Sequence, residues 1–427
     1  MSESLGITPL DELVAAFRGY MAIDDPAHIA FALAVAVAAR LDGDPLWGML
    51  VGAPSSGKIE TLRALDEVAD EHLDDISAAG LLSWLPGKRP RPTGLLSRRQ
   101  GRVFATVADF STLLAMSDKG SRDTLYALLR RAYDGRVVRE LGNAPEPLRW
   151  EGRLTLLAAV TPTVDNYATH ADALGARWLY VRLPTPSEAT SRQASRKARQ
   201  GGTTLREHRE HVRGLAGPIV QTAVARAVSI RESDMLGDQL DDAAMVTCVG
   251  RADVPRSGYG RRDIIGAVTI EEPPRLAGQL ALLARASLAL GLTEEQTASL
   301  CRRAALDSMP LARRDTLAAL ASGEPLAQSE VARRTGLDRG VARRALEELA
   351  ATGIASCEGA EDEEEGPRGD WYLTGEHAPL IAKVFTARNG VPKSVLHPHN
   401  PPREGGSNTL FGTAPAADIS GKVEAPA

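Results

Sequence analysis

The segment at residues 51–60, Val-Gly-Ala-Pro-Ser-Ser-Gly-Lys-Ile-Glu, constrains the fold of this chain more than any other. It holds the pattern Gly-x-x-x-x-Gly-Lys from Gly52 to Lys58. An apolar run at 46–51 precedes it with the composition of a buried strand, and a helical pattern at 61–73 follows it. In that setting the backbone N–H groups of a glycine-rich loop form a concave site for phosphate oxygens. The segment therefore predicts an α/β fold with a nucleotide-binding loop after its first strand.

The sequence of the loop also limits its chemistry. The residues expected to contact a nucleotide are Gly52, Ser55, Ser56, Gly57 and Lys58. Lys58 would reach the outer phosphates, and a Ser or Thr should follow it to place a hydroxyl on Mg²⁺. Ile59 stands there instead and cannot bind a metal, while Thr61 would point to another side of the helix. The alternative interpretation is an ordinary glycine-rich turn with a surface lysine.

Two further apolar runs end in polar side chains. Residues 103–110 form a short apolar run with Asp109 near its end, as a strand beside a nucleotide site does when its carboxylate holds Mg²⁺ through water. Asp109 could instead cap the helix that begins there. Residues 153–160 form a near-continuous apolar strand, as a parallel sheet needs, and end at Thr161. Thr161 lies where ligands of α/β proteins bind, although it could also cap a helix.

Composition narrows the class of protein but not its activity. A length of 427 residues predicts two or three domains, and a hydrophobic content of 43% is enough for real cores. The net charge of −5 argues neither for nor against nucleic acid. The cysteines Cys248, Cys301 and Cys357 are scattered, without metal-ligand spacing. No signal peptide and no apolar segment of about 20 residues is visible, so we expect a cytoplasmic protein with no membrane partner.

The rest of the chain divides into helical and hairpin patterns. Residues 9–41, 185–233 and 276–290 have helical periodicity, whereas 234–274 are weakly patterned. Strand-like runs around a turn cluster predict a hairpin over 135–152. Shorter elements are expected as well: a hairpin or loop at 76–93, helices at 111–116 and 122–133, and a strand at 178–183. The expected units are N-terminal helices at 1–44, an α/β core at 45–185, a helical lid or linker at 186–310, a winged helix-turn-helix at 311–386 and a disordered tail at 387–427.

The winged-helix pattern has its own candidate binding residues. Its third helix, 339–352, carries Arg339, Arg343 and Arg344, and its inward face is expected to hold Val341, Ala345, Leu346 and Leu349. Arg339 and Arg343 lie four residues apart and share the face that would enter a DNA groove. The following loop, 358–365, is acidic and would be repelled by phosphate. We therefore expect the helix to contact DNA, and a protein-contact module is the alternative.

Taken in order, the phosphate loop, the acid-ended strand, the hairpin, the Thr-tipped strand, the Arg177-Trp178 segment and the C-terminal winged helix resemble the AAA+ ATPases, in particular the MCM-like group. The chain also resembles AAA-like proteins of actinobacteria and their phages. The resemblance implies an α/β fold with an AAA+-type core, ATP bound between the subunits of a homo-oligomer, and DNA at the 135–152 hairpin. It implies that Thr161 is the first sensor, Arg177 an arginine finger and Arg275 the second sensor, in cis or in trans. Arg177 could instead be a surface residue that caps a strand, and Arg275 could simply pair with Glu271 or Glu272.

Two departures from the AAA+ pattern bear on activity. Ile59 replaces the Mg²⁺ hydroxyl, and the second strand should end in Asp-Glu, whereas Asp109 stands between Ala108 and Phe110. One acid is missing in either alignment. Asp109 stands at the catalytic Glu with Ala108 in place of the metal-holding Asp, or Asp109 holds the metal and Phe110 replaces the Glu. We expect ATP binding with impaired hydrolysis and little dependence on Mg²⁺, in a helicase-like factor or one that replicates or maintains a mobile element. The alternative is a non-enzymatic DNA-binding transcriptional regulator with a degenerate nucleotide site.

Overall fold

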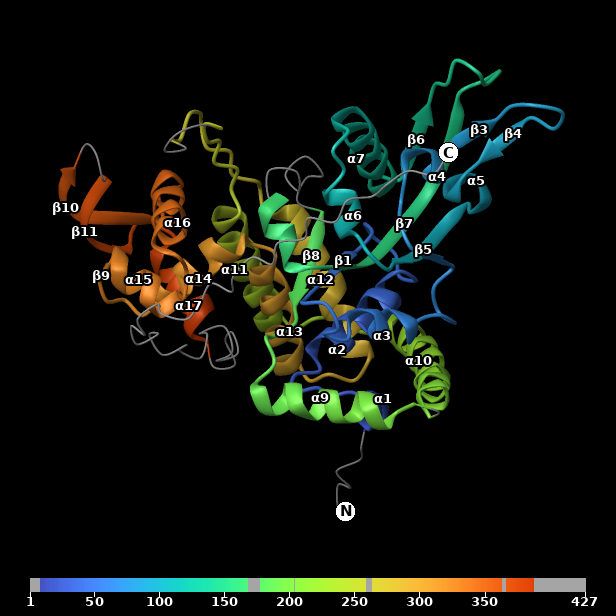
Figure 1. Ribbon diagram of the computed structural model, residues 1–427, viewed down its shortest axis with the longest axis horizontal. Coiled ribbons are helices and arrows are strands. Elements are labelled where there is room, and N and C mark those ends of the chain that lie inside the picture. The colour runs from blue at the N-terminus through green and yellow to red at the C-terminus, as the bar shows by residue number, and fades with distance from the viewer. Residues whose placement is uncertain (1–7, 168–176, 203, 259–262, 363–365, 388–427) are drawn as a thin grey trace, which may run out of the picture.

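The computed structural model describes residues 8–167, 177–202, 204–258, 263–362 and 366–387 (Figure 1). Its central sheet has six strands, five of them in the spatial order β2-β5-β7-β1-β8, with β6 paired to β7. The members of the sheet are β1 (Trp47–Val51), β2 (Glu71–Leu73), β5 (Gly101–Val107), β6 (Arg136–Arg139), β7 (Leu148–Val160) and β8 (Trp178–Arg182). Every pair along that order is parallel, and only β6 runs antiparallel to its neighbour. The expected α/β fold with a largely parallel sheet is confirmed.

Both faces of the sheet are covered, which explains why its strands read as continuous apolar runs. Successive side chains of a strand point to opposite faces, so each strand divides between two cores. Leu50 and Leu157 belong to a core shared with the helices at both ends of the α/β unit. Met49 and Leu156, one residue earlier in each strand, belong to a second core on the other face. The sheet is thus the middle of three layers.

The first core is built mainly from helices outside the 45–185 segment. They are α1 (Pro9–Tyr20), α2 (Ala27–Ala38), α10 (Leu205–Ala227), α11 (Asp234–Gly250), α12 (Pro274–Ala289) and α13 (Glu294–Asp307). α2 is buried over nearly its whole surface because it packs between the sheet and α10 and α12. Another helix, α9 (Glu188–Gln200), crosses the lower edge of the molecule in Figure 1. The N-terminal helices and the region after 186 therefore share one hydrophobic core with the sheet.

The second core lies under short elements that follow the glycine-rich loop at 52–58. They are α4 (Ala78–Leu81), α5 (Leu95–Arg98), α6 (Ser111–Leu114) and α7 (Lys119–Tyr133), together with the hairpin of β3 (Ser83–Leu85) and β4 (Arg91–Thr93). The hairpins expected at 76–93 and 135–152 are both present. They project from the same end of the sheet (Figure 1) and are joined there, because the Arg139 guanidinium donates to the carbonyl oxygens of Ala78 and Leu82.

Three expectations about local structure were wrong. The helix expected at 61–73 is short, because α3 (Lys58–Arg63) gives way to turns and then to β2. The weakly patterned region at 234–274 begins with α11, a helix of 17 residues. Strands expected separately at 148–152 and 153–160 form the single strand β7 of 13 residues. In each case the contacts that decide the structure come from distant parts of the chain.

The C-terminal unit has a small core of its own. Its helices are α14 (Leu311–Leu320), α15 (Gln328–Thr335), α16 (Arg339–Ala351) and α17 (Ala378–Thr386), and its antiparallel sheet joins β9 (Leu326–Ala327), β10 (Ala355–Asp362) and β11 (Gly366–Leu373). The tail expected to be disordered lies outside the described residues from 388 onward. In the described part of the chain, no helix has the length and apolarity needed to cross a bilayer.

Candidate nucleotide site

The glycine-rich loop leaves the carboxyl end of β1 in the middle of the sheet. Its backbone turns sharply, with Ser55 and Gly57 in the left-handed region at φ 62° and φ 99°. Gly57 suits this conformation because it lacks a Cβ, and a Cβ there would lie 2.4 Å from the Met21 methyl. A Cβ on Gly52 would likewise lie 2.7 Å from the Ser56 hydroxyl oxygen. The left-handed backbone therefore requires glycine at position 57, whereas at position 52 a side chain would have to displace that of Ser56.

Lys58 is held beneath the loop and is not a surface residue. Only 7% of it is exposed. Its Nζ donates to the carbonyl oxygens of Gly52 at 2.5 Å and Ala53 at 2.7 Å, and lies 3.4 Å from Ser56 Oγ. Burial lowers the pKa of the Lys58 ammonium, while the Asp109 carboxylate acts in the opposite direction. The loop therefore keeps a cation at its centre, and the simple turn with a surface lysine is wrong.

The residues after Lys58 serve packing and not metal binding. Ile59 is half-buried and packs against the first core. The Thr61 hydroxyl is buried and donates to the Gly57 carbonyl oxygen at 3.1 Å, so it points back along α3. The described residues contain no cluster of three or more His, Cys, Asp or Glu side chains suited to a metal. Neither Ile59 nor Thr61 offers an oxygen in place of the missing hydroxyl.

Asp109 and Thr161 follow neighbouring parallel strands and meet at the same edge of the sheet. Asp109 is exposed, and its Oδ1 accepts the Ser111 amide proton at 2.9 Å. The Ser111 hydroxyl lies 3.1 Å from Thr161 Oγ1 and accepts the Thr161 amide proton at 3.1 Å. A further 2.5 Å contact joins the hydroxyls of Thr161 and Thr163. Ser111 and Thr163 were not among the expected site residues. The sequence feature that could have indicated them is the presence of hydroxyl side chains just after two predicted strands.

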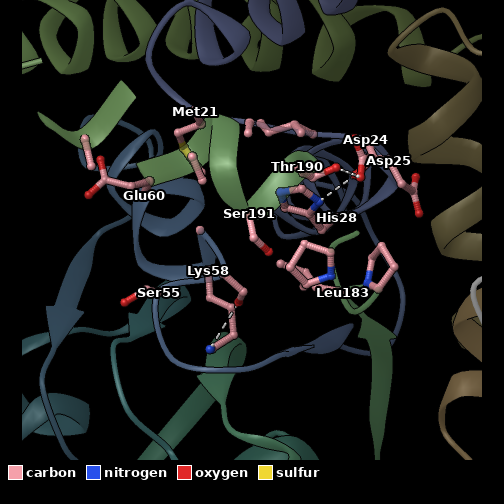
Figure 2. Close-up of a pocket in the computed structure, with 18 of the residues that line it drawn as sticks. Met21, Asp24, Asp25, His28, Ser55, Lys58, Glu60, Leu183, Thr190 and Ser191 are labelled. Atoms are coloured by element: carbon pink, nitrogen blue, oxygen red, sulfur yellow. Dashed lines mark hydrogen bonds between the residues drawn. The ribbon is translucent and has the colours of Figure 1, made fainter. Parts of the chain in front are cut away.

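A cavity of about 650 Å³ opens beside the loop (Figure 2). Its walls come from the loop at 54–60, the α1–α2 connection at 20–25 with His28, and residues 183–198 at the end of β8 and in α9. Pockets for small ligands and cofactors fall in the range of about 300–1,000 Å³. The cavity thus offers room for a nucleotide next to Lys58. Of its walls, only the loop was indicated by a local sequence pattern.

His28 is the most deeply buried titratable side chain on that cavity wall. Only 4% of it is exposed, and burial lowers its pKa to about 4, so the ring is neutral near pH 7. Its Nδ1 lies 3.1 Å from the Asp25 carbonyl oxygen, while its Nε2 is buried without a hydrogen-bond partner among the described residues. Leaving a buried polar atom unsatisfied costs about 1–3 kcal/mol. Close by, the Thr190 hydroxyl donates to the Asp24 carboxylate at 2.6 Å.

The structure places the two candidate arginines together, but away from the cavity walls. The side chain of Arg177 is 11% exposed, pairs with Asp134 at 3.0 Å and stacks over the Tyr133 ring. Arg275 is more exposed and pairs with Glu271 at 3.4 Å. Both guanidinium groups act electrostatically on Tyr133, whose pKa is raised to about 12 mainly by burial. The pairing of Arg275 with Glu271 is the expected alternative to a sensor role. The assignments of Arg177 to a neighbouring subunit's nucleotide and of Arg275 to the second sensor stay predictions.

The candidate DNA-contacting arginines differ in whether they already form ion pairs within the protein. Arg339 is exposed at the start of α16. Arg343 pairs with Glu347 on the next turn at 3.3 Å. Arg344 has no ion pair among the described residues. The buried face of α16 consists of Ala342, Ala345, Leu346 and Leu349, so Ala342 takes the inward place expected for Val341. The acidic loop is described only in part, because residues 363–365 lie outside the described residues.

The loop with Lys58, Asp109 and Thr161 therefore all lie at the carboxyl ends of the parallel strands. Arg177 and Arg275 lie elsewhere, both near Tyr133. In the comparisons with known proteins, no family model and no curated sequence matches this chain.

Proposed function

We propose that this protein is an AAA+-type ATP-binding protein that also binds DNA. The observation that carries the proposal is the buried ammonium of Lys58 beneath a glycine-rich loop, beside a cavity of about 650 Å³. A phosphate chain would compete with the Gly52 and Ala53 carbonyl oxygens for that ammonium. The surrounding backbone N–H groups would receive the remaining phosphate oxygens.

The position of the loop in the sheet supports the same conclusion. β1 lies between β7 and β8, and the chain leaves it toward β2 on one side and returns with β8 on the other. In open parallel sheets, ligands bind outside the carboxyl ends of the strands where the order of connection reverses. The loop, Asp109 and Thr161 all lie at that edge. A ligand seated there would meet groups from three strands.

Hydrolysis would be slow in such a site. Asp109 is the acid expected to hold Mg²⁺ through water, yet its Oδ1 already accepts the Ser111 amide proton. Ile59 packs against the first core, also lines the cavity, and supplies no oxygen. If Mg²⁺ binds with the nucleotide, Asp109 would hold it and the metal would neutralise charge on the transferred phosphate. ATP binding without efficient turnover follows from this set of ligands.

DNA binding is proposed for the C-terminal unit and for the hairpins that project from the sheet. Helix α16 presents Arg339 to solvent after a turn that follows α15, in the order of a winged helix-turn-helix. Lys88, Arg89 and Arg91 are exposed on the β3–β4 hairpin, next to the β6–β7 hairpin. In a homo-oligomer, Arg177 and Arg275 would complete the nucleotide site of the adjacent subunit.

The alternative is a non-enzymatic transcriptional regulator that uses the nucleotide site as a switch. The inward packing of Ile59 favours it, because metal-dependent chemistry has no hydroxyl there. The distinction is measurable as ATP turnover with and without duplex DNA. Hydrolysis above that of a Lys58→Ala variant supports an enzyme, and equal rates in the two proteins support the regulator.

The test of nucleotide binding itself is a calorimetric titration with ATP in Mg²⁺ and in EDTA. Lys58→Ala should abolish binding, whereas Lys88→Ala, on an exposed hairpin, should bind like the wild type. The wild-type affinity should change by less than about threefold between the two conditions, because residue 59 contributes no metal ligand. Equal affinity of wild type and Lys58→Ala would contradict the proposed function.

A further inference from the structure

A second cavity, of about 500 Å³, lies between α1, the start of α2 and α13. Its volume falls within the range of small-ligand pockets, about 300–1,000 Å³. Asp25 lines both this cavity and the one beside the glycine-rich loop, whereas the other described residues of the two walls differ. The apolar part of the wall is formed by Leu10, Val14, Ala30, Leu292, Leu300 and Leu306. This space therefore suits a ligand with an apolar body.

Most charged side chains on this second cavity already have partners or face water. Arg303 on α13 pairs with Asp25 from the connection between α1 and α2. The Asp11 carboxylate accepts from the amide of Thr8 at 3.1 Å and from its hydroxyl at 2.7 Å, in the capping box of α1. Arg18 is exposed. None of these groups needs a ligand to compensate its charge.

Arg302 differs from its neighbours on the cavity wall. It is partly buried on α13, between the second cavity and a smaller one of about 210 Å³. Glu294 and Glu295 line the smaller cavity, yet no ion pair or hydrogen bond joins Arg302 to any side chain or carbonyl group of the described residues. Burial lowers the pKa of its guanidinium. A partly buried cation without a counter-charge would be stabilised by an anion placed beside it.

We propose that the second cavity binds a small amphipathic carboxylate, with its chain against the apolar wall and its head group on Arg302. A carboxylate fits this position because a planar guanidinium can donate two parallel hydrogen bonds to its oxygens. The leucines and Ala30 would remove the chain from water, which favours binding in proportion to the apolar area covered. The proposal does not depend on nucleotide binding, because Lys58 lies in the other cavity.

Octanoate and 1-octanol test the role of Arg302, because they share one chain and differ in the charge of the head group. In calorimetric titrations of the full chain, octanoate should bind about tenfold more tightly, as a charge-assisted hydrogen bond predicts. Arg302→Met keeps an apolar stem and removes the guanidinium, so it should bind both ligands equally. Arg131→Met, on the exposed side of α7, should keep the wild-type ratio. Absent octanoate binding, equal wild-type affinities, or an unchanged ratio in Arg302→Met would overturn the proposal.

The position of the ligand is measured on proteins that keep Arg302, which covers the case in which Arg302→Met does not fold. A diazirine analogue of octanoate should label peptides of α1 or α13 in the wild type. Labelling confined to residues 54–60 or 183–198 would place it in the cavity beside the loop and overturn the second site. Lys58→Ala should bind octanoate like the wild type. A protein that binds octanoate but no ATP would contradict the proposed function and leave this inference intact.

Discussion

At the scale of single residues, the side chain at position 59 contributes to the hydrophobic core but offers no metal ligand. The side chain of Ile59 packs on the core that joins α2, α10 and the sheet. Packing against these neighbours therefore explains an apolar side chain at position 59. The same apolar side chain leaves the candidate site without a hydroxyl. A substitution can supply that hydroxyl at a small cost in packing.

Ile59→Thr should make ATP binding depend on Mg²⁺. We expect an affinity gain of about fivefold in Mg²⁺ over EDTA, equivalent to about 1 kcal/mol. The matched control is Ile59→Val, which removes a similar amount of apolar surface without adding an oxygen. Titrations of both variants with ATP check this prediction, and an equal response of the two would show that the hydroxyl does not reach the metal.

His28 should also make stability depend on pH. Its pKa is lowered to about 4 by burial, against about 6.5 in an unfolded chain, so the unfolded state binds the proton first as the pH falls. Its contribution is fully present above pH ~6.5 and is lost progressively toward pH ~4. The expected loss is about 2 kcal/mol between pH 7 and pH 5. Urea unfolding at both pH values measures it, and His28→Phe should show a smaller change.

At the scale of helices and strands, the arginines of α16 should contribute unequally to DNA binding. Arg343 already pairs with Glu347, whereas Arg339 is exposed. Removing Arg339 should therefore weaken binding more than removing Arg343, and should lower the salt slope of the affinity by about 1. Arg333→Ala is the control, because Arg333 is held by Glu330 on α15. Fluorescence anisotropy over a range of salt concentrations measures the slope, and identical slopes in all variants would exclude α16 as the contact.

The elements that sequence could predict are those whose signal is local. β1, β8 and the later parts of β5 and β7 are apolar runs because both faces of the sheet are buried there, and the helices α2 and α12 also have clear local patterns. β2 was mistaken for helix because its three residues, Glu-His-Leu, carry no alternation and become a strand only by pairing with β5. α11 is rich in Asp and Gly, and only its packing against α12 and α13 fixes it as a helix.

The candidate site divides in the same way. The loop and Lys58 are contiguous, so the sequence identified them, and Asp109 and Thr161 follow from the ends of parallel strands. The cavity was not predictable, because its walls come from three separate segments near residues 20–28, 54–60 and 183–198. Likewise, His28 Nδ1 contacts the backbone carbonyl of Asp25, and Nε2 has no hydrogen-bond partner among the described residues. Such features exist only once the fold is formed.

At the scale of the whole molecule, a buried network of ion pairs joins the sheet to the C-terminal helices. Arg182 at the end of β8 binds the Asp165 carboxylate through two hydrogen bonds of 2.8 Å and reaches the backbone of Asp307 in α13. Asp307 in turn pairs with Arg314 in α14. Arg182, Asp307 and Arg314 are buried, while 22% of the Asp165 side chain is exposed. The buried guanidinium of Arg182 therefore depends on its partners to compensate its charge.

Removing one partner should therefore destabilise the protein strongly. Asp165→Ala leaves Arg182 buried with fewer acceptors, and we expect a loss of about 3–5 kcal/mol in the free energy of unfolding. Glu188→Ala, which breaks an exposed pair with Arg192, should have little effect. Guanidinium-induced unfolding of the two variants checks the contrast. A small loss in Asp165→Ala would mean that solvent or a neighbouring side chain compensates Arg182.

The position of β1 in the sheet also sets when the candidate nucleotide site can form during synthesis. Residues 48–51 pair with 157–160, and residues 47–51 pair with 178–182, so both neighbours of β1 emerge from the ribosome more than 100 residues later. At about 5–20 residues per second, β1 waits roughly 5–20 s for its first neighbour. Throughout that interval its apolar side chains lack both strand partners, and a chain that stops before residue 157 can never supply either. The glycine-rich loop after β1 is encoded early in the chain, but the sheet that surrounds it is completed late.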